Sequence, residues 1–212
     1  MPFRLTLRPS LLPGFAALVL LLRAAPAGAQ VKDVVVGVTP TCPYGLSACW
    51  AGAYEGLGHL EGVESVAAAP DAYNCTAHVH LKGKGLPDLD KWPEQFKAAV
   101  GDAYVFRGVE VTAKGSVSEK DGNLVLDVPG LGRPFSLAPL EHKLQWNFRK
   151  GSARQPEEDE KNAYRQLAAK SKDAKSGGLR VEVTGPLRAT GKGLTLEVRE
   201  FFLVTPEAGR HN

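Results

Sequence analysis

Along residues 31–111, hydrophobic positions recur every two residues in some stretches and every three or four in others. These two periods divide the segment into short strands and helices. β-Branched or alternating apolar residues favour strands in four places: 34–38, 63–68, 75–81 and 104–111. Residues spaced three or four apart favour two helices, one burying Ala53, Leu57 and Leu60 and the other burying Trp92, Phe96 and Ala99. The predicted order is therefore strand, helix, strand, strand, helix, strand.

This order is that of the ferredoxin-like βαββαβ split, whose four strands lie in the sheet order 4-1-3-2. Strand three is then antiparallel to strand one and next to it, so the start of strand three meets the end of strand one. Cys75 opens the third predicted strand, while Cys42 and Cys49 follow the first. The sequence therefore predicts that all three cysteines converge at one end of the sheet.

The remaining residues, 109–205, are mostly strand-forming. Strands are expected at 110–117, 123–128, 134–137, 144–148, 179–185 and 194–204. One helix is expected at 155–171, because acidic residues open it and basic residues close it, as the helix dipole favours. Trp146 and Phe148 share one face of their strand, which we interpret as barrel core.

Strands, one helix and two final strands resemble an OB-fold, a partly open five-stranded barrel. The expected fold class is therefore α+β. It consists of a ferredoxin-like βαββαβ domain at 31–108 followed by an OB-like β-barrel with one helix at 109–205.

The first 29 residues have the features of a secretory signal peptide. Arg4 and Arg8 precede an apolar run at 11–22, and Ala27-Gly28-Ala29 provides small residues for cleavage. The apolar run is shorter than the roughly twenty residues that span a bilayer. We therefore expect signal cleavage after residue 29, no membrane span in the mature chain, and a periplasmic or secreted location.

Removal of this segment changes the charge of the chain. The whole sequence has 26 basic and 23 acidic residues. Arg4, Arg8 and Arg23 belong to the expected signal peptide, which contains no acidic residue. The mature chain is then neutral in net charge, so its composition does not indicate nucleic acid as a partner.

Cys42, Cys49 and Cys75 are the strongest candidates for a functional site. Three thiolates near a helix N-terminus could bind a soft cation such as Cu(I) or Zn(II). However, six residues separate Cys42 from Cys49, whereas ligands on one loop usually lie two to four apart. An oxidising location favours a disulfide instead, and three cysteines allow three different single bridges. Buried, inert thiols are the third interpretation.

The stretch Cys49–Val66, CWAGAYEGLGHLEGVESV, carries a family resemblance. A strand, a cysteine that opens a helix, and Gly62-Val63 before a second strand follow in the order of a heavy-metal-associated (HMA), copper-chaperone-like domain. Cys49 stands where that family has the second cysteine of its CxxC, and Leu46 stands where it has the first. The resemblance covers about residues 31–108 and implies binding of copper or zinc through the loop after strand one.

Motifs for catalysis are absent from the sequence, including the Gly-x-Ser-x-Gly elbow, the His-Glu-x-x-His helix and the phosphate loop. We therefore expect an exported, noncatalytic binding protein with a degenerate metal site made from Cys42, Cys49 and Cys75. The alternative is a structural or interaction module of the cell envelope, with a disulfide in place of the metal site and an envelope protein as partner. An OB-type binder of oligosaccharide or peptide is a third hypothesis.

Overall fold

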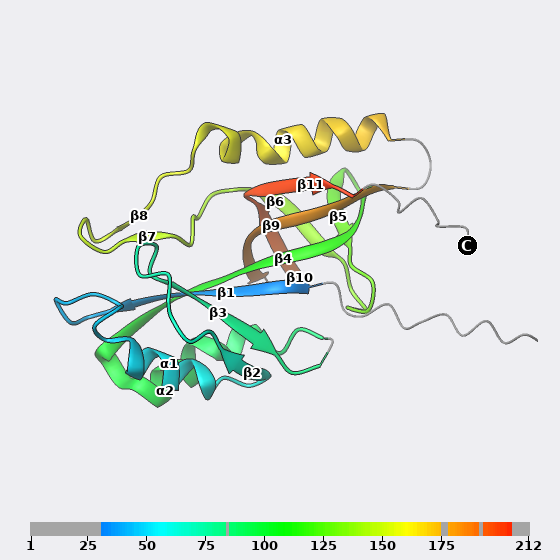
Figure 1. Ribbon diagram of the computed structural model, residues 1–212. Helices are drawn as coiled ribbons and strands as arrows, with labels where there is room; N and C mark the ends of the chain where they lie inside the picture. The colour runs from blue at the N-terminus through cyan, green and yellow to red at the C-terminus, as the bar shows by residue number, and fades with distance from the viewer. Residues whose placement is uncertain (1–30, 84, 175–177, 191–192, 205–212) are drawn as a thin grey trace, which may run out of the picture.

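The computed structural model describes residues 31–204, apart from 84, 175–177 and 191–192 (Figure 1). The expected signal peptide at 1–29 lies outside these residues. Within the described part of the chain, no helix combines the length and the apolar character needed to cross a bilayer.

The described elements are mainly strands. The strands are β1 (Val31–Pro40), β2 (Val63–Val66), β3 (Thr76–Leu81), β4 (Tyr104–Lys120), β5 (Asn123–Asp127), β6 (Phe135–Pro139), β7 (Trp146–Asn147), β8 (Ser152–Ala153), β9 (Leu179–Thr190), β10 (Gly193–Val198) and β11 (Glu200–Leu203). The helices are α1 (Trp50–Gly58), α2 (Trp92–Val100) and α3 (Glu158–Asp173), with 3-10 turns η1 (Leu89–Lys91) and η2 (Gly101–Ala103).

Strand β4 organises the fold, because it is 17 residues long and pairs along both edges. One edge pairs with β1 over residues 104–113 and then with β5 over 116–120. The opposite edge pairs with β9 over 109–117. All these pairings are antiparallel, and on the far side of β1 the sheet continues through β3 to β2.

The nine strands of this sheet follow the order β11-β9-β10-β6-β5-β4-β1-β3-β2, and the extra β9–β4 pairing closes five of them into a barrel. Within the barrel, β6 and β10 run parallel to each other. Close strand approach requires a glycine at Gly185, since a Cβ atom there would collide with the carbonyl oxygen of Glu197.

The expected fold class is wrong. The structure is mostly β, with 43% strand and 24% helix, and it combines a closed five-stranded barrel with further strands and three helices. It is not a ferredoxin-like βαββαβ domain followed by an OB-like barrel with one helix. The physical reason is β4, which runs unbroken through residue 108 and contributes to both parts of one sheet. The domain bounds 31–108 and 109–205 stay a prediction.

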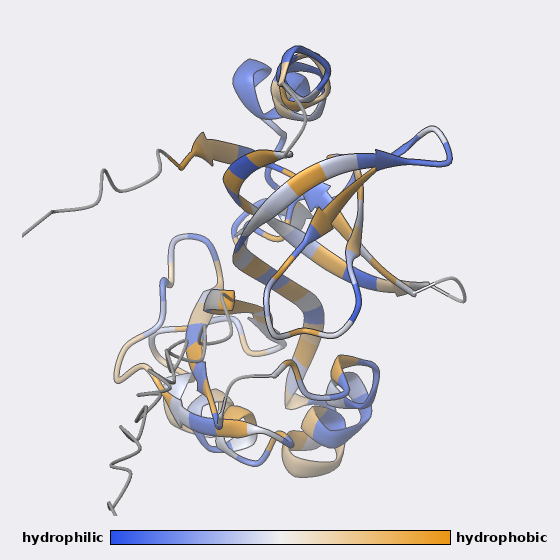
Figure 2. Cartoon of the chain, turned by 90° about the vertical axis from the view of Figure 1, so that its right-hand side faces the viewer, coloured by the Kyte–Doolittle hydropathy of each residue, from blue (hydrophilic) through white to orange (hydrophobic). Residues whose placement is uncertain are grey.

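Buried apolar side chains from both parts form one continuous cluster. Leu57 on α1, Phe96 on α2 and Leu167 on α3 are each at most 1% exposed and belong to it. In Figure 1, α1 and α2 lie together beside β2 and β3, whereas α3 lies at the other end of the molecule, beside β11. Figure 2 shows hydrophobic and hydrophilic residues alternating along the barrel strands, as expected for walls with one buried face.

Residues 140–157 form a segment outside the large sheet, which we call the strap. The strand expected at 144–148 is shorter than predicted, since β7 covers two residues only. It pairs with β8 in a separate two-stranded sheet and does not join the barrel. Trp146 and Phe148 are half-buried and are not barrel core. The amide of Trp146 instead donates to the carbonyl of Asn74, 2.9 Å away, so the strap crosses back to the first part of the chain.

Candidate functional site

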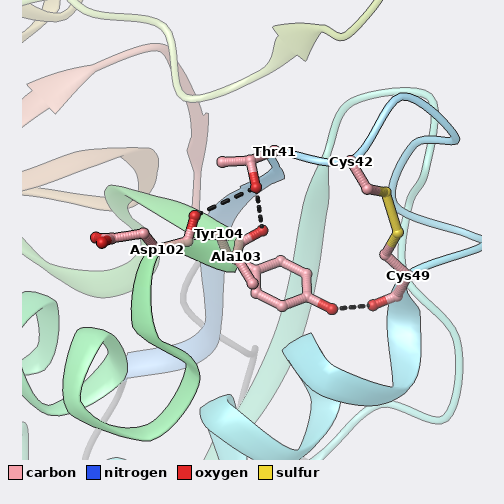
Figure 3. The surroundings of a disulfide bond; sticks show 6 residues. All are labelled: Thr41, Cys42, Cys49, Asp102, Ala103 and Tyr104. Carbon is pink, nitrogen blue, oxygen red and sulfur yellow. Dashed lines mark hydrogen bonds between the residues drawn. A yellow bond between two sulfur atoms is a disulfide. The ribbon is translucent and has the colours of Figure 1, made fainter.

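A disulfide joins Cys42 to Cys49 and closes the loop between β1 and α1 (Figure 3). Thr41, just before the bridge, donates its hydroxyl to the carbonyls of Asp102 and Ala103 at 3.2 and 3.0 Å. On the other side, the Tyr104 hydroxyl donates to the carbonyl of Cys49. Both ends of the loop are therefore anchored to the segment that leads into β4.

The third cysteine, Cys75, is a free thiol with no exposed surface. Burial raises the pKa of this thiol, and the positive charge of Arg107 only partly opposes the shift. Its sulfur lies 3.8 Å from the carbonyl oxygen of Ala72. In this environment the neutral thiol is favoured over the thiolate.

Two cysteines of the expected metal site are therefore joined in a disulfide, and the third is a free thiol. Cys42 and Cys49 are bridged, and bridged sulfurs provide no thiolate for a soft metal. Cys75 alone retains a titratable sulfur. Metal binding by Cys42, Cys49 and Cys75 stays a prediction, and it applies only to a chain in which the bridge has been reduced.

Three segments that are distant in sequence meet at the strap. Gly45, in the disulfide loop, has a φ of 81°, and its Cβ position lies 3.6 Å from the Phe148 ring. Two residues earlier on the strap, Trp146 donates its amide to the carbonyl of Asn74, the neighbour of Cys75. The disulfide loop and the residue before Cys75 thus both lie against the strap.

Exposed aromatic and basic side chains gather where these segments meet. Tyr44 in the disulfide loop is 79% exposed, and Tyr73 is 74% exposed. The Arg154 guanidinium lies 3.7 Å from the centre of the Tyr73 ring and donates to the Tyr73 carbonyl at 2.7 Å. We call this surface the tyrosine–arginine face and define it by five residues: Tyr44, Tyr73, Phe148, Arg149 and Arg154.

The tyrosine–arginine face surrounds a hollow of about 550 Å³. Besides the five residues of the face, the lining comprises Gly45, Leu46, Ser47, Ala72 and Asn147. None of these lining residues is acidic. The hollow therefore combines apolar rings with uncompensated positive charge, a composition suited to binding rather than to acid–base chemistry.

Arg107 holds the strap in place beneath this face. Its guanidinium donates to the Thr39 hydroxyl and to the Cys75 carbonyl, each at 2.6 Å, and also to the carbonyl of Leu144. The same group lies 5.0 Å from the centre of the Trp146 ring. Burial lowers the pKa of Arg107 to about 10. One half-buried side chain thus ties β1, the residue before β3 and the strap together.

A second charged group joins the strap and α3 to the barrel. Glu110 accepts two hydrogen bonds from the Arg199 guanidinium, both at 3.1 Å. Glu160 pairs with Lys143 at 2.6 Å and with Arg199 at 3.5 Å. Although burial alone would raise it, the pKa of Glu160 is lowered by the hydrogen bond and charge of Lys143. Because these charges compensate one another, we interpret the group as structural.

Among the described residues, one cluster has the spacing for a cation, namely Glu141, His142 and Glu197, whose ligand atoms lie within 4.8 Å of one another. The buried Glu197 carboxylate already accepts the amides of Glu141 and His142, each at 2.8 Å. It also pairs with Arg188 at 3.1 Å. A metal ion would have to displace Arg188, so this cluster does not form a convincing metal site.

The chain matches no protein-family model, and neither a curated protein nor a solved structure is significantly similar to it. The resemblance to a heavy-metal-associated domain therefore stays a prediction.

Sequence reasoning identified the cysteines but missed the face around them. Tyr44, Tyr73 and Arg154 lie in three separate loops, and no periodic pattern relates them. A usable signal was present in the aromatic residues of turn-rich segments, since polar loops seldom need rings for packing. Arg149 and Lys150 also escape sequence reasoning, because nothing in the sequence shows that their hairpin folds back onto the disulfide loop.

Proposed function

We propose that this chain is an exported, noncatalytic interaction module that holds a partner at the tyrosine–arginine face. In this proposal the disulfide takes the place of the expected metal site. The bridge fixes the loop that carries Tyr44, and the strap brings Arg149 and Arg154 to the same surface. The observation that carries the proposal is the convergence of two exposed tyrosines, exposed Arg149 and half-buried Arg154 around a hollow without acidic lining.

Residue type supports binding over catalysis. Tyrosine and arginine are enriched in the centres of protein interfaces, where rings provide contact area and guanidinium groups provide directed hydrogen bonds. Cys75, the one unbridged cysteine, is buried with a raised pKa, which disfavours it as a nucleophile. A Cys42–Cys49 bridge is also the kind of feature that persists in an oxidising compartment, in keeping with export.

Selection of displayed random peptides on the disulfide-bonded protein tests this function without assuming a ligand. The proposal predicts peptides whose affinity falls about tenfold or more on a Tyr44→Ala/Arg154→Gln double variant. The matched control is Arg133→Gln, an exposed arginine in the β5–β6 loop. Circular dichroism establishes that each variant is folded. If every selected peptide binds the double variant as well as the control, the face is not a binding site.

A further inference from the structure

In the part of the chain that the structure describes, the positive charge of the tyrosine–arginine face has no ion-pair partner, in contrast to Arg188 and Arg199 on the barrel. Arg188 and Arg199 each pair with a buried carboxylate on the barrel. Within the described residues, no ion pair joins Arg149, Lys150 or Arg154 to an acidic side chain. The strap hairpin thus carries three cations without an ion-pair partner, of which Arg154 already donates a hydrogen bond to the Tyr73 carbonyl.

Asp71, an acidic residue of the loop that carries Tyr73, accepts hydrogen bonds within its own loop. Its two carboxylate oxygens accept hydrogen bonds from the backbone amide and the side-chain amide of Asn74, at 3.1 and 2.7 Å. These bonds hold Asp71 within its own turn. Among the described residues, no ion pair joins Asp71 to a cation of the strap hairpin.

The hydrogen-bond donors and acceptors that line the hollow also indicate which kind of ligand would fit it. Guanidinium groups only donate, and the side-chain acceptors of the lining are all neutral: the hydroxyls of Tyr44, Tyr73 and Ser47 and the amide of Asn147. The arginines are therefore the charged hydrogen-bonding groups of the hollow. A ligand rich in acceptors, above all carboxylates, would complement the arginines, which bind carboxylate in a bidentate manner.

The aromatic rings indicate what accompanies the carboxylates. Tyr44 and Tyr73 are both largely exposed, and the stacked Arg154 fixes the orientation of the Tyr73 ring. Such rings offer apolar contact area at low entropic cost. We infer that the face recognises an acidic peptide segment of a partner protein, with glutamate or aspartate side chains beside an apolar or aromatic residue. This inference rests on the proposed function and names the ligand class of the same site.

Fluorescence anisotropy with two defined probes tests the inference on the disulfide-bonded protein. One probe is a fluorescein-labelled peptide in which glutamates alternate with phenylalanine and glycine, and the other has lysine at every glutamate position. The glutamate peptide should bind, and the lysine peptide should not. Affinity for the glutamate peptide should fall about tenfold or more on Arg149→Glu and should weaken with added salt.

Arg133→Glu is the matched control, since it makes the same charge change on a surface remote in sequence from the strap. Equal binding of the two probes, or equal affinity for Arg149→Glu and Arg133→Glu, would overturn the inference. Polygalacturonate, an acidic polysaccharide, serves as a third probe. If it binds through Arg149 while the glutamate peptide does not, the ligand is a polysaccharide and the peptide assignment is wrong.

The two proposals fail in different ways. Displayed peptides whose binding requires Tyr44 and Arg154 but which lack acidic residues would support the binding function. They would contradict the inference of an acidic ligand. The absence of any face-dependent peptide, together with no binding of the glutamate probe, would remove both.

Discussion

Arg154 and Tyr73 are 81 positions apart, yet the Arg154 guanidinium stacks on the Tyr73 ring and donates to the Tyr73 backbone carbonyl at 2.7 Å. The contact links the end of the strap to the loop before β3. Tyr73 is therefore held in a defined orientation although most of its surface is exposed.

We expect Arg154→Gln to lower the free energy of unfolding by about 1–2 kcal/mol, since it removes the stacking contact and one charged hydrogen bond. It should also speed hydrogen exchange in residues 71–74, which lose their tie to the strap. Arg149→Gln is the control, because Arg149 is exposed and has no ion pair among the described residues. Similar exchange in the two variants would show that Arg154 does not order this loop.

Loss of the Cys42–Cys49 bridge should destabilise the fold by about 2–3 kcal/mol, as the loop-closure model gives for a bridge that closes so short a loop. Urea unfolding of wild type and Cys42→Ser/Cys49→Ser, with and without reductant, measures the effect. Reductant should lower the stability of wild type only. If reductant affected both proteins equally, the lost stability would not come from the bridge.

The Glu110–Arg199 pair predicts a strong asymmetry between single and double substitutions. Glu110→Gln leaves the Arg199 charge, whose side chain is 18% exposed, without its bidentate partner. Because Arg199 keeps Glu160 and Glu200 as partners, we expect a loss of about 1–3 kcal/mol from this single change. Glu110→Gln/Arg199→Met should cost less than the sum of the two singles by about 1 kcal/mol or more. Strict additivity in urea unfolding would contradict the pairing.

Glu160 predicts how stability depends on acid pH. The pKa of its carboxyl is lower in the folded chain than the ordinary value of 4.5. The stabilisation it provides is therefore fully present above about pH 4.5 and is lost as the pH falls through the folded value. Glu160→Gln should cost about 2 kcal/mol at neutral pH and should flatten the decline of stability with acid.

The control for this pH dependence is Glu158→Gln on the same helix, because the Glu158 side chain is 82% exposed. Its stability profile between pH 3 and 7 should follow that of wild type. A Glu160→Gln profile that still declines as steeply as wild type would show that other carboxyls dominate acid unfolding.

Local patterns predicted much of the secondary structure because they report short-range preferences. The alternation in β3 gave the burial of Ala77 and Val79 and the exposure of His78 and His80 correctly. The helix spacing gave the burial of Leu57, Trp92 and Phe96, whereas Ala99 proved exposed. Such patterns relate residues that are only a few positions apart in the chain.

The fold class and the candidate face depend on contacts between distant segments. The pairing of β4 with β9, which begins at Val109 and Leu187, has no local signal. The same holds for the approach of Gly45 and Phe148, which line the same hollow. Convergence of the cysteines was a topological prediction, but sequence alone left open which of the three possible bridges would form.

The most direct test of the account is the affinity of a face-dependent peptide for one protein sample before and after reduction of Cys42–Cys49. If the bridge holds Tyr44 in the binding face, reduction of the folded protein should weaken binding about tenfold or more. The Cys42→Ser/Cys49→Ser variant should bind weakly and be insensitive to reductant. Equal affinity of the oxidised and the reduced protein would contradict the claim that the disulfide loop forms the binding site.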